Sequence, residues 1–189
     1  CMTLAGAQAA LAAERLAFVP TGVLAPGLAQ LLALRNRIGP CAAVQLMARL
    51  IDPFRGGSLR IACARSPAEL DVLRELLVAA GADALLMPAT EGEAFANPQR
   101  RPRIERVHDG MARVLFEQEA AHAPVEVPAT ELGARATATL IRSMLDTPAL
   151  IPAPIAHQLA CCLFASGHVA EFNEAKAVVA VATRSLAIA

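Results

Sequence analysis

The densest group of charged side chains that could do chemistry is a run of arginines between residues 99 and 106. It reads Gln-Arg-Arg-Pro-Arg-Ile-Glu-Arg and contains Arg100, Arg101, Arg103 and Arg106. A guanidinium presents parallel N–H donors that match the oxygens of a phosphate. We therefore expect a local patch that binds a polyanion, either nucleic acid or another phosphorylated ligand. The alternative is an exposed loop that leads into a strand.

Composition limits what such a patch can do. The chain has 17 basic and 17 acidic residues, which excludes a uniformly basic nucleic-acid-binding protein. It has no Trp and no Tyr, and aromatic residues make up 3% of it. Single-strand binders stack bases on aromatic side chains, so we expect contacts with phosphates rather than with bases.

A second candidate is a pair of carboxylates, Glu91 and Glu93, directly after a predicted strand. Open α/β sheets bind ligands beyond the carboxyl ends of their strands. The pair could hold a cation or a ribose hydroxyl, or it is a solvated acidic turn. The sequence contains no nucleophile elbow, phosphate loop, dinucleotide fingerprint or zinc-protease motif, and we assign no catalytic residue from it.

The histidines and cysteines lack the spacing of metal ligands, and we expect each histidine to be either structural or simply exposed. Free cysteines behave as small buried hydrophobes in a reducing cytoplasm. The histidines are His108, His122, His157 and His168, and the cysteines are Cys1, Cys41, Cys63, Cys161 and Cys162.

The middle of the chain predicts a strand, a helix and a second strand. The strands cover residues 58–64 and 84–87, and Ser66, Pro67 and Glu69 form a strong helix start between them. A strand, a crossover helix and a strand predict two parallel strands with a right-handed connection.

Hydrophobic spacing predicts the other elements. We expect helices over 3–15, 26–36, 41–51, 130–145, 155–165 and 172–187, a strand over 17–19, and a hairpin of 104–108 with 111–117 across Asp109 and Gly110. Together these elements predict one α/β domain over residues 1–189, with a mixed, largely parallel sheet flanked by helices.

We expect neither a membrane span nor a signal peptide. The longest segment without charged residues, 147–170, is broken by three prolines, and its uninterrupted apolar part, 159–165, is far shorter than the roughly 20 residues that a span needs. The first residues carry no long apolar run before Glu14. Together with the free cysteines, which suit a reducing compartment, the sequence predicts a cytoplasmic protein.

Several stretches resemble one known family. Residues 35–54, RNRIGPCAAVQLMARLIDPF, are similar to a stretch of the anthranilate phosphoribosyltransferases, within the glycosyl transferase family 3 superfamily. Residues 59–87 resemble the strand, helix and strand that follow there, and residues 158–182 resemble the closing helices. The stretches LAPGLAQLLALR, LIDPF and TEGEAFANP are most like those of the divergent YbiB-type paralogues.

The resemblance implies a fold, an assembly and a function. The fold is the phosphoribosyltransferase (nucleoside phosphorylase-like) α/β domain, of which this chain matches the carboxyl-terminal portion. The family's amino-terminal helical domain and its glycine-rich phosphate-binding loop are not among these 189 residues. The resemblance to the YbiB-type paralogues implies a homodimer that binds nucleic acid. Such a protein would be a paralogue of the tryptophan-biosynthesis enzyme and would not itself take part in tryptophan synthesis.

The family's substrate residues are replaced here. Its anthranilate-contacting arginine falls on Cys41, and its Phe-Asn pair falls on Val44 and Gln45. The resemblance thus implies that anthranilate transfer has been lost, and that Arg35, Cys41 and Gln45 would line any remodelled acceptor pocket.

The family's magnesium-binding Asp-Glu pair falls on Ala94 and Phe95, with Glu91 and Glu93 nearby but out of register. Our leading hypothesis is therefore a protein that binds nucleic acid or another polyphosphate. The alternative is a magnesium-dependent phosphoribosyl or glycosyl transferase for another aromatic acceptor, in which Glu91 or Glu93 holds the metal. A third interpretation is a packing module whose helices serve dimerisation.

Overall fold

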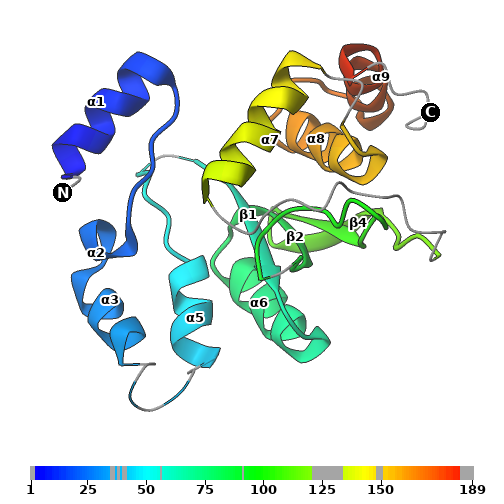
Figure 1. Ribbon diagram of the computed structural model, residues 1–189. Coiled ribbons are helices and arrows are strands. Elements are labelled where there is room, and N and C mark those ends of the chain that lie inside the picture. The colour runs from blue at the N-terminus through cyan, green and yellow to red at the C-terminus, as the bar shows by residue number, and fades with distance from the viewer. Residues whose placement is uncertain are drawn as a thin grey trace. The chain divides into compact units, whose positions relative to one another are not determined.

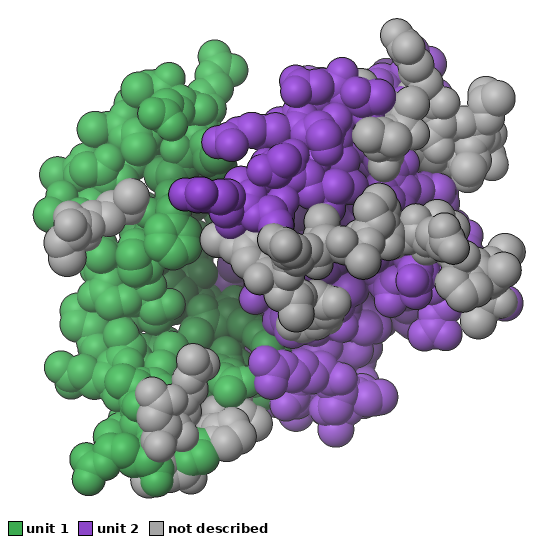
Figure 2. Space-filling model, viewed as in Figure 1, with its two compact units in different colours: residues 1–58 green, residues 59–189 purple. Residues whose placement is uncertain are grey.

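The computed structural model describes residues 3–34, 37, 39, 42–55, 57–90, 92–120, 134–147 and 151–183. Contacts divide the chain into two compact units, residues 1–58 and 59–189, where the sequence predicts one domain (Figure 2). In the described ranges, no helix is both long enough and apolar enough to cross a membrane.

The first unit is helical. Its helices are α1 (Leu4–Glu14), α2 (Thr21–Leu24), α3 (Pro26–Ala33) and α5 (Ala42–Arg49). Helix α1 begins after Thr3, whose hydroxyl oxygen accepts a hydrogen bond from the Gly6 N–H at 3.1 Å. The strand predicted over residues 17–19 is wrong, because these residues pair with no strand in the described part of the chain and Phe18 is 75% exposed. A short apolar run forms a strand only beside another strand.

The second unit holds a four-stranded sheet and its covering helices. Its elements are β1 (Leu59–Ala64), α6 (Pro67–Ala79), β2 (Asp83–Pro88), β3 (Ile104–His108), β4 (Met111–Phe116), α7 (Ala134–Asp146), α8 (Ala153–Ala165) and α9 (Phe172–Thr183). The strand order is β1-β2-β3-β4. Strands β1 and β2 are parallel, as predicted, and the other two pairings are antiparallel.

The sheet is therefore mixed, but the prediction that it is largely parallel is wrong for the described strands. Two parallel neighbours need a long crossover, usually a helix. Helix α6 supplies one between β1 and β2. The loop from β2 to β3 contains no helix among its described residues, and β3 and β4 join as a hairpin, so both pairings run antiparallel.

Local signals fix the ends of helix α6 where the sequence predicts them. The Ser66 hydroxyl accepts a hydrogen bond from the Glu69 N–H at 3.2 Å, and Pro67 occupies the first turn. Gly81, with a φ of +59°, follows the helix and turns the chain into β2. The predicted strand, helix and parallel strand are thus confirmed.

The β3–β4 hairpin is also confirmed. Asp109 and Gly110 have φ values of +49° and +69°, as the two central residues of a type I′ turn require. The turn sets the register, in which Arg106 lies opposite Arg113 and His108 lies opposite Met111.

Helices α6 and α8 pack on opposite faces of this sheet (Figure 1). On the α8 face, Ile104 packs with Cys161 and Ala165. On the other face, Leu73 and Leu77 of α6 are fully buried. Because successive side chains of a strand point to opposite faces, neighbouring residues of β3 enter two different environments.

Candidate functional site: the rim of the sheet

Segments that are far apart in the sequence meet at one edge of the sheet. Strands β1 and β2 both end there, β3 begins there, and β4 ends there, since β3 is antiparallel to both of its neighbours. We call this edge the rim, and define it by Arg65 after β1, Thr90 after β2, residues 97–103 before β3, and residues 117–119 after β4. It is the edge at which open α/β sheets bind ligands.

The rim contains a small pocket of about 140 Å³. Its lining includes Pro88, Thr90, Asn97, Arg100, Pro102 and Gln118. The Arg100 side chain is exposed, and its guanidinium forms no ion pair with another described residue. The pocket thus combines an available cation with uncharged polar side chains.

Arg65 is a second guanidinium of the rim, and we did not single it out from the sequence. Its side chain lies against Gly92, where a Cβ atom would come within 3.2 Å of the Arg65 Nη2. Gly92 has a φ of +90°, a conformation that favours glycine. Arg65 is exposed and forms no ion pair within the described part of the chain. Its position directly after a predicted strand was the available signal.

Arg101 is held by the chain after β4. Its Nη1 lies 3.3 Å from the Glu119 Oε1, and its Nε donates to the Glu117 carbonyl oxygen at 3.3 Å. The guanidinium carbon lies 4.6 Å from the centre of the Phe116 ring, a cation–π contact. The Arg101 side chain is 19% exposed, so most of its contacts are with the protein.

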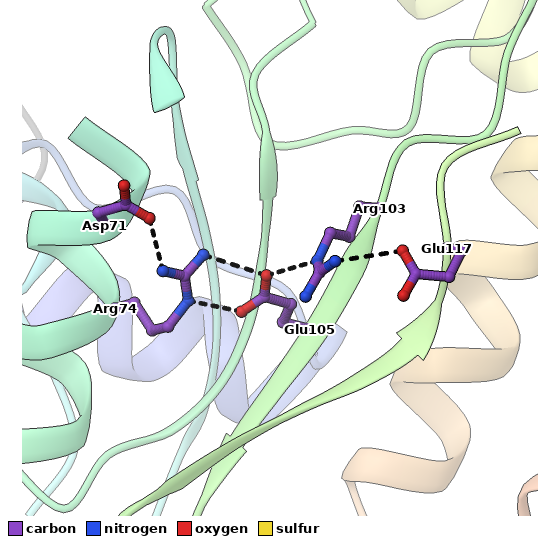
Figure 3. A network of polar contacts seen from close by, with 5 residues as sticks. All are labelled: Asp71, Arg74, Arg103, Glu105 and Glu117. Carbon is purple, nitrogen blue, oxygen red and sulfur yellow. Dashed lines mark hydrogen bonds and ion pairs between the residues drawn. The ribbon is translucent and has the colours of Figure 1, made fainter. Parts of the chain in front are cut away.

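Arg103 belongs to a network of alternating charges on the α6 face (Figure 3). Its Nε donates to the Glu105 Oε1 at 2.8 Å, and its Nη1 lies 3.2 Å from the Glu117 Oε2. On the other side of Glu105, the Arg74 Nε and Nη2 donate to the two carboxylate oxygens at 2.6 Å and 3.1 Å. Arg74 also contacts Asp71 at 2.6 Å.

Glu105 is the centre of this network and is 5% exposed. Burial alone would raise its pKa, because a buried carboxylate loses its hydration. The hydrogen bonds and charges of Arg74 and Arg103 outweigh burial and hold the pKa of Glu105 below its ordinary value of 4.5. The same contacts raise the pKa of Arg74. Glu105 and Arg74 are therefore both ionised near neutral pH.

Arg106 lies on the opposite, α8 face. Its Nη2 donates to the Ala165 carbonyl oxygen at 3.1 Å and lies 3.6 Å from the Asp83 Oδ2. Its guanidinium carbon lies 5.2 Å from the centre of the Phe164 ring. The four predicted arginines therefore do not form one patch. Arg100 lines the rim pocket, Arg103 reaches toward α6, and Arg101 and Arg106 contact residues of the α8 face.

The other predicted site residues are only partly covered. Arg35, Cys41 and Glu91 lie outside the described residues, and Gln45 is a half-buried residue of α5 in the first unit. Glu93 exchanges two backbone hydrogen bonds with Thr90, at 2.9 Å and 3.0 Å.

The described residues show no cluster of metal ligands. They contain no group of three or more His, Cys, Asp or Glu side chains that could hold a metal. Magnesium usually keeps several waters and binds through one or two carboxylates together with substrate phosphates. Of the two carboxylates predicted to hold it, only Glu93 is described. The transferase alternative stays a prediction, since Arg35, Cys41 and Glu91, on which it depends, are not described.

Two of the three described cysteines are buried, as predicted, and Cys162 is half-buried. Cys63 and Cys161 are buried, and burial raises the pKa of the Cys161 thiol to about 12. His157 is also buried, and its ring centre lies 4.8 Å from that of Phe116. His108 is exposed, and its Nδ1 lies 3.2 Å from the Asp83 Oδ2.

A buried amide holds the loop that leads to the rim, and sequence analysis did not identify it. The Gln158 Oε1 accepts a hydrogen bond from the Ala96 N–H at 2.7 Å, and its Nε2 donates to the Ala94 carbonyl oxygen at 3.1 Å. Gln158 thereby connects helix α8 to the segment before Asn97 and Arg100.

Comparison with known proteins gives one relationship. No model of a known protein family matches the chain. The chain is 34% identical over 174 residues to a protein of Escherichia coli (strain K12) described as "Uncharacterized protein YbiB". The match covers 92% of this chain and 54% of that protein, so the chain spans about half the length of this relative. The similarity supports a YbiB-type relationship.

Proposed function

We propose that the chain binds nucleic acid through its phosphates, at the rim of the sheet. The observation that carries the proposal is the rim pocket, in which exposed Arg100 forms no ion pair with a described residue beside the polar side chains of Thr90, Asn97 and Gln118. Arg65 adds a second available guanidinium at the same edge. Arginine forks match phosphate oxygens, and phosphate contacts carry no base sequence.

Arg103 supports the proposal as a third phosphate contact. Its side chain is 46% exposed and that of its partner Glu117 is 70% exposed. Exposed ion pairs contribute about 0–1 kcal/mol, so a phosphate can replace Glu117 at little cost while Glu105 keeps its bond to the Arg103 Nε. A homodimer, which the family resemblance implies, would carry two rims and bind a long strand more tightly.

The test is the salt dependence of binding. We expect the chain to bind a fluorescently labelled DNA duplex. A plot of log affinity against log salt concentration should have a slope of about −3, because three arginines contact phosphates. The double variant Arg65→Gln/Arg100→Gln should bind about tenfold or more weakly, with a slope lower by about 2.

A matched control is Arg142→Gln, which changes an exposed arginine of α7 that also forms no ion pair with a described residue. It should bind like the unmodified chain. Binding that is insensitive to salt, or that the double variant leaves unchanged, would overturn the proposal.

A further inference from the structure

A second cavity, of about 300 Å³, lies between the β3–β4 hairpin and the helices of the α8 face. Its lining includes Arg106, Met111 and Arg113 from the hairpin, and Phe164 and Phe172 from α8 and the start of α9. We call it the hairpin pocket. Volumes of this size hold small organic ligands.

Two arginines lie on the wall of the hairpin pocket, together with His108 and the carboxylate of Asp109. Arg106 and Arg113 lie directly opposite each other in the antiparallel register, so both point to the same face of the sheet. Two like charges at such positions, with Cβ atoms about 5 Å apart, destabilise the pairing. Arg106 has the Asp83 carboxylate at 3.6 Å. Arg113 is exposed and forms no ion pair with any described residue.

Two carboxylates lie near these arginines, and each is also close to His108. The Asp83 Oδ2 lies 3.2 Å from the His108 Nδ1 as well as close to Arg106. The Asp109 Oδ2 lies 3.5 Å from the His108 Nε2 and is mostly exposed. A bound anion would therefore meet Arg113 and the outer face of Arg106, and it would relieve the repulsion between the two arginines.

Aromatic rings form the other wall of the hairpin pocket. The Phe164 and Phe172 ring centres are 5.4 Å apart and tilted by 59°. The guanidinium of Arg106 lies 5.2 Å from the Phe164 ring centre. Flat rings and a guanidinium plane offer stacking surfaces to an aromatic ligand. These phenylalanines come from segments remote from the arginine run, which is why the sequence did not predict a stacking surface.

We propose that the hairpin pocket is a separate binding site for a small aromatic anion of the size of a nucleoside monophosphate. The base would pack against Phe164 and Phe172, and the phosphate would bind between Arg106 and Arg113. The site uses none of the residues proposed to bind nucleic acid at the rim, so the two proposals stand or fall independently.

The test is calorimetric titration of the chain with adenosine monophosphate, adenosine and inorganic phosphate. We expect the monophosphate to bind at least tenfold more tightly than either half, because both walls contribute. Equal affinity for the monophosphate and for adenosine or phosphate alone would overturn the proposal.

Variants locate the site. Arg113→Gln and Phe164→Leu should each lower the affinity for adenosine monophosphate about tenfold, and Arg142→Gln should not change it. Arg113 is exposed, so its variant is expected to fold, and circular dichroism checks this for both. The rim variant Arg65→Gln/Arg100→Gln should bind the monophosphate normally. Loss of binding in the rim variant, or normal binding in Arg113→Gln, would overturn the assignment.

Discussion

The two faces of the sheet hold their arginines in opposite ways. On the α6 face, Arg74 and Arg103 flank the buried carboxylate of Glu105, so each positive charge meets a negative one. On the α8 face, Arg106 and Arg113 face each other across the hairpin, and Arg113 has no carboxylate partner among the described residues. Paired charges stabilise the fold, whereas an arginine without a carboxylate partner beside a cavity, as Arg113 is among the described residues, is available to a ligand.

Removing the buried carboxylate on the α6 face should have the largest effect on stability. Glu105→Gln leaves Arg74 and Arg103 without their shared carboxylate and should lower the free energy of unfolding by about 2–3 kcal/mol. Urea denaturation measures this. Glu117→Gln is the control, because this exposed member of the same network should change stability by less than about 0.5 kcal/mol. Equal effects of the two changes would contradict a central role for Glu105.

The stability that Glu105 contributes should also depend on pH. Because the folded-state pKa of Glu105 is lowered, its contribution to stability is present above its ordinary value of 4.5 and is lost as the pH falls through the folded-state pKa. The stability difference between the unmodified chain and Glu105→Gln should therefore be constant near neutral pH and shrink in acid. Denaturation curves at several pH values check this. A difference that grows in acid would show that the carboxylate is not ionised in the fold.

Removing one of the two facing arginine charges on the α8 face should stabilise the fold slightly. Arg113→Gln removes one of two like charges and should raise the free energy of unfolding by about 0.2–1 kcal/mol in the absence of a ligand. Arg106→Gln is the informative partner, because it also loses the hydrogen bond to the Ala165 carbonyl oxygen and should destabilise. Thermal denaturation at low salt separates the two. Destabilisation by Arg113→Gln would mean that its charge is already balanced.

The last prediction concerns the reactivity of a thiol in the core of the α8 face, where we expect almost no reaction in the native chain. Burial raises the pKa of Cys161 to about 12, so its thiol stays protonated and unreactive near neutral pH. A thiol reagent should modify it far more slowly in the native chain than in urea, as followed by peptide mass spectrometry. Rapid native labelling would indicate that solvent penetrates the α8 face.

Local signals in the sequence predicted much of the second unit. Ser66 and Pro67 begin α6, and Asp109 and Gly110 form the hairpin turn, because these residue types impose their own backbone geometry. The strand over 17–19 failed, since a strand requires a partner that its own residues do not specify. The fold is thus best predicted where the deciding interaction is short in sequence.

The candidate site was harder to predict for the same reason. The sequence shows four neighbouring arginines, but which charge or ring each one meets is decided by residues far along the chain. Arg106 contacts Phe164, and Arg103 shares Glu105 with Arg74 of another element. The alternation of side chains along a strand would have placed Arg103 and Arg106 on opposite faces of the sheet. No local pattern identifies Arg113 as part of a pocket or Gln158 as the residue that holds the loop before the rim.

The hydrogen bond between the Ala96 N–H and the Gln158 side chain makes hydrogen exchange at Ala96 a measure of how firmly the loop is held against α8. The Ala96 N–H donates a hydrogen bond to the Gln158 Oε1 of α8 at 2.7 Å, and Ala96 is fully buried. Its proton exchanges with solvent when that bond opens, that is, when the loop and α8 separate. Deuterium uptake at this one position should therefore slow if a ligand in the hairpin pocket holds α8 in place. Occupancy could then be measured at a residue that touches no ligand.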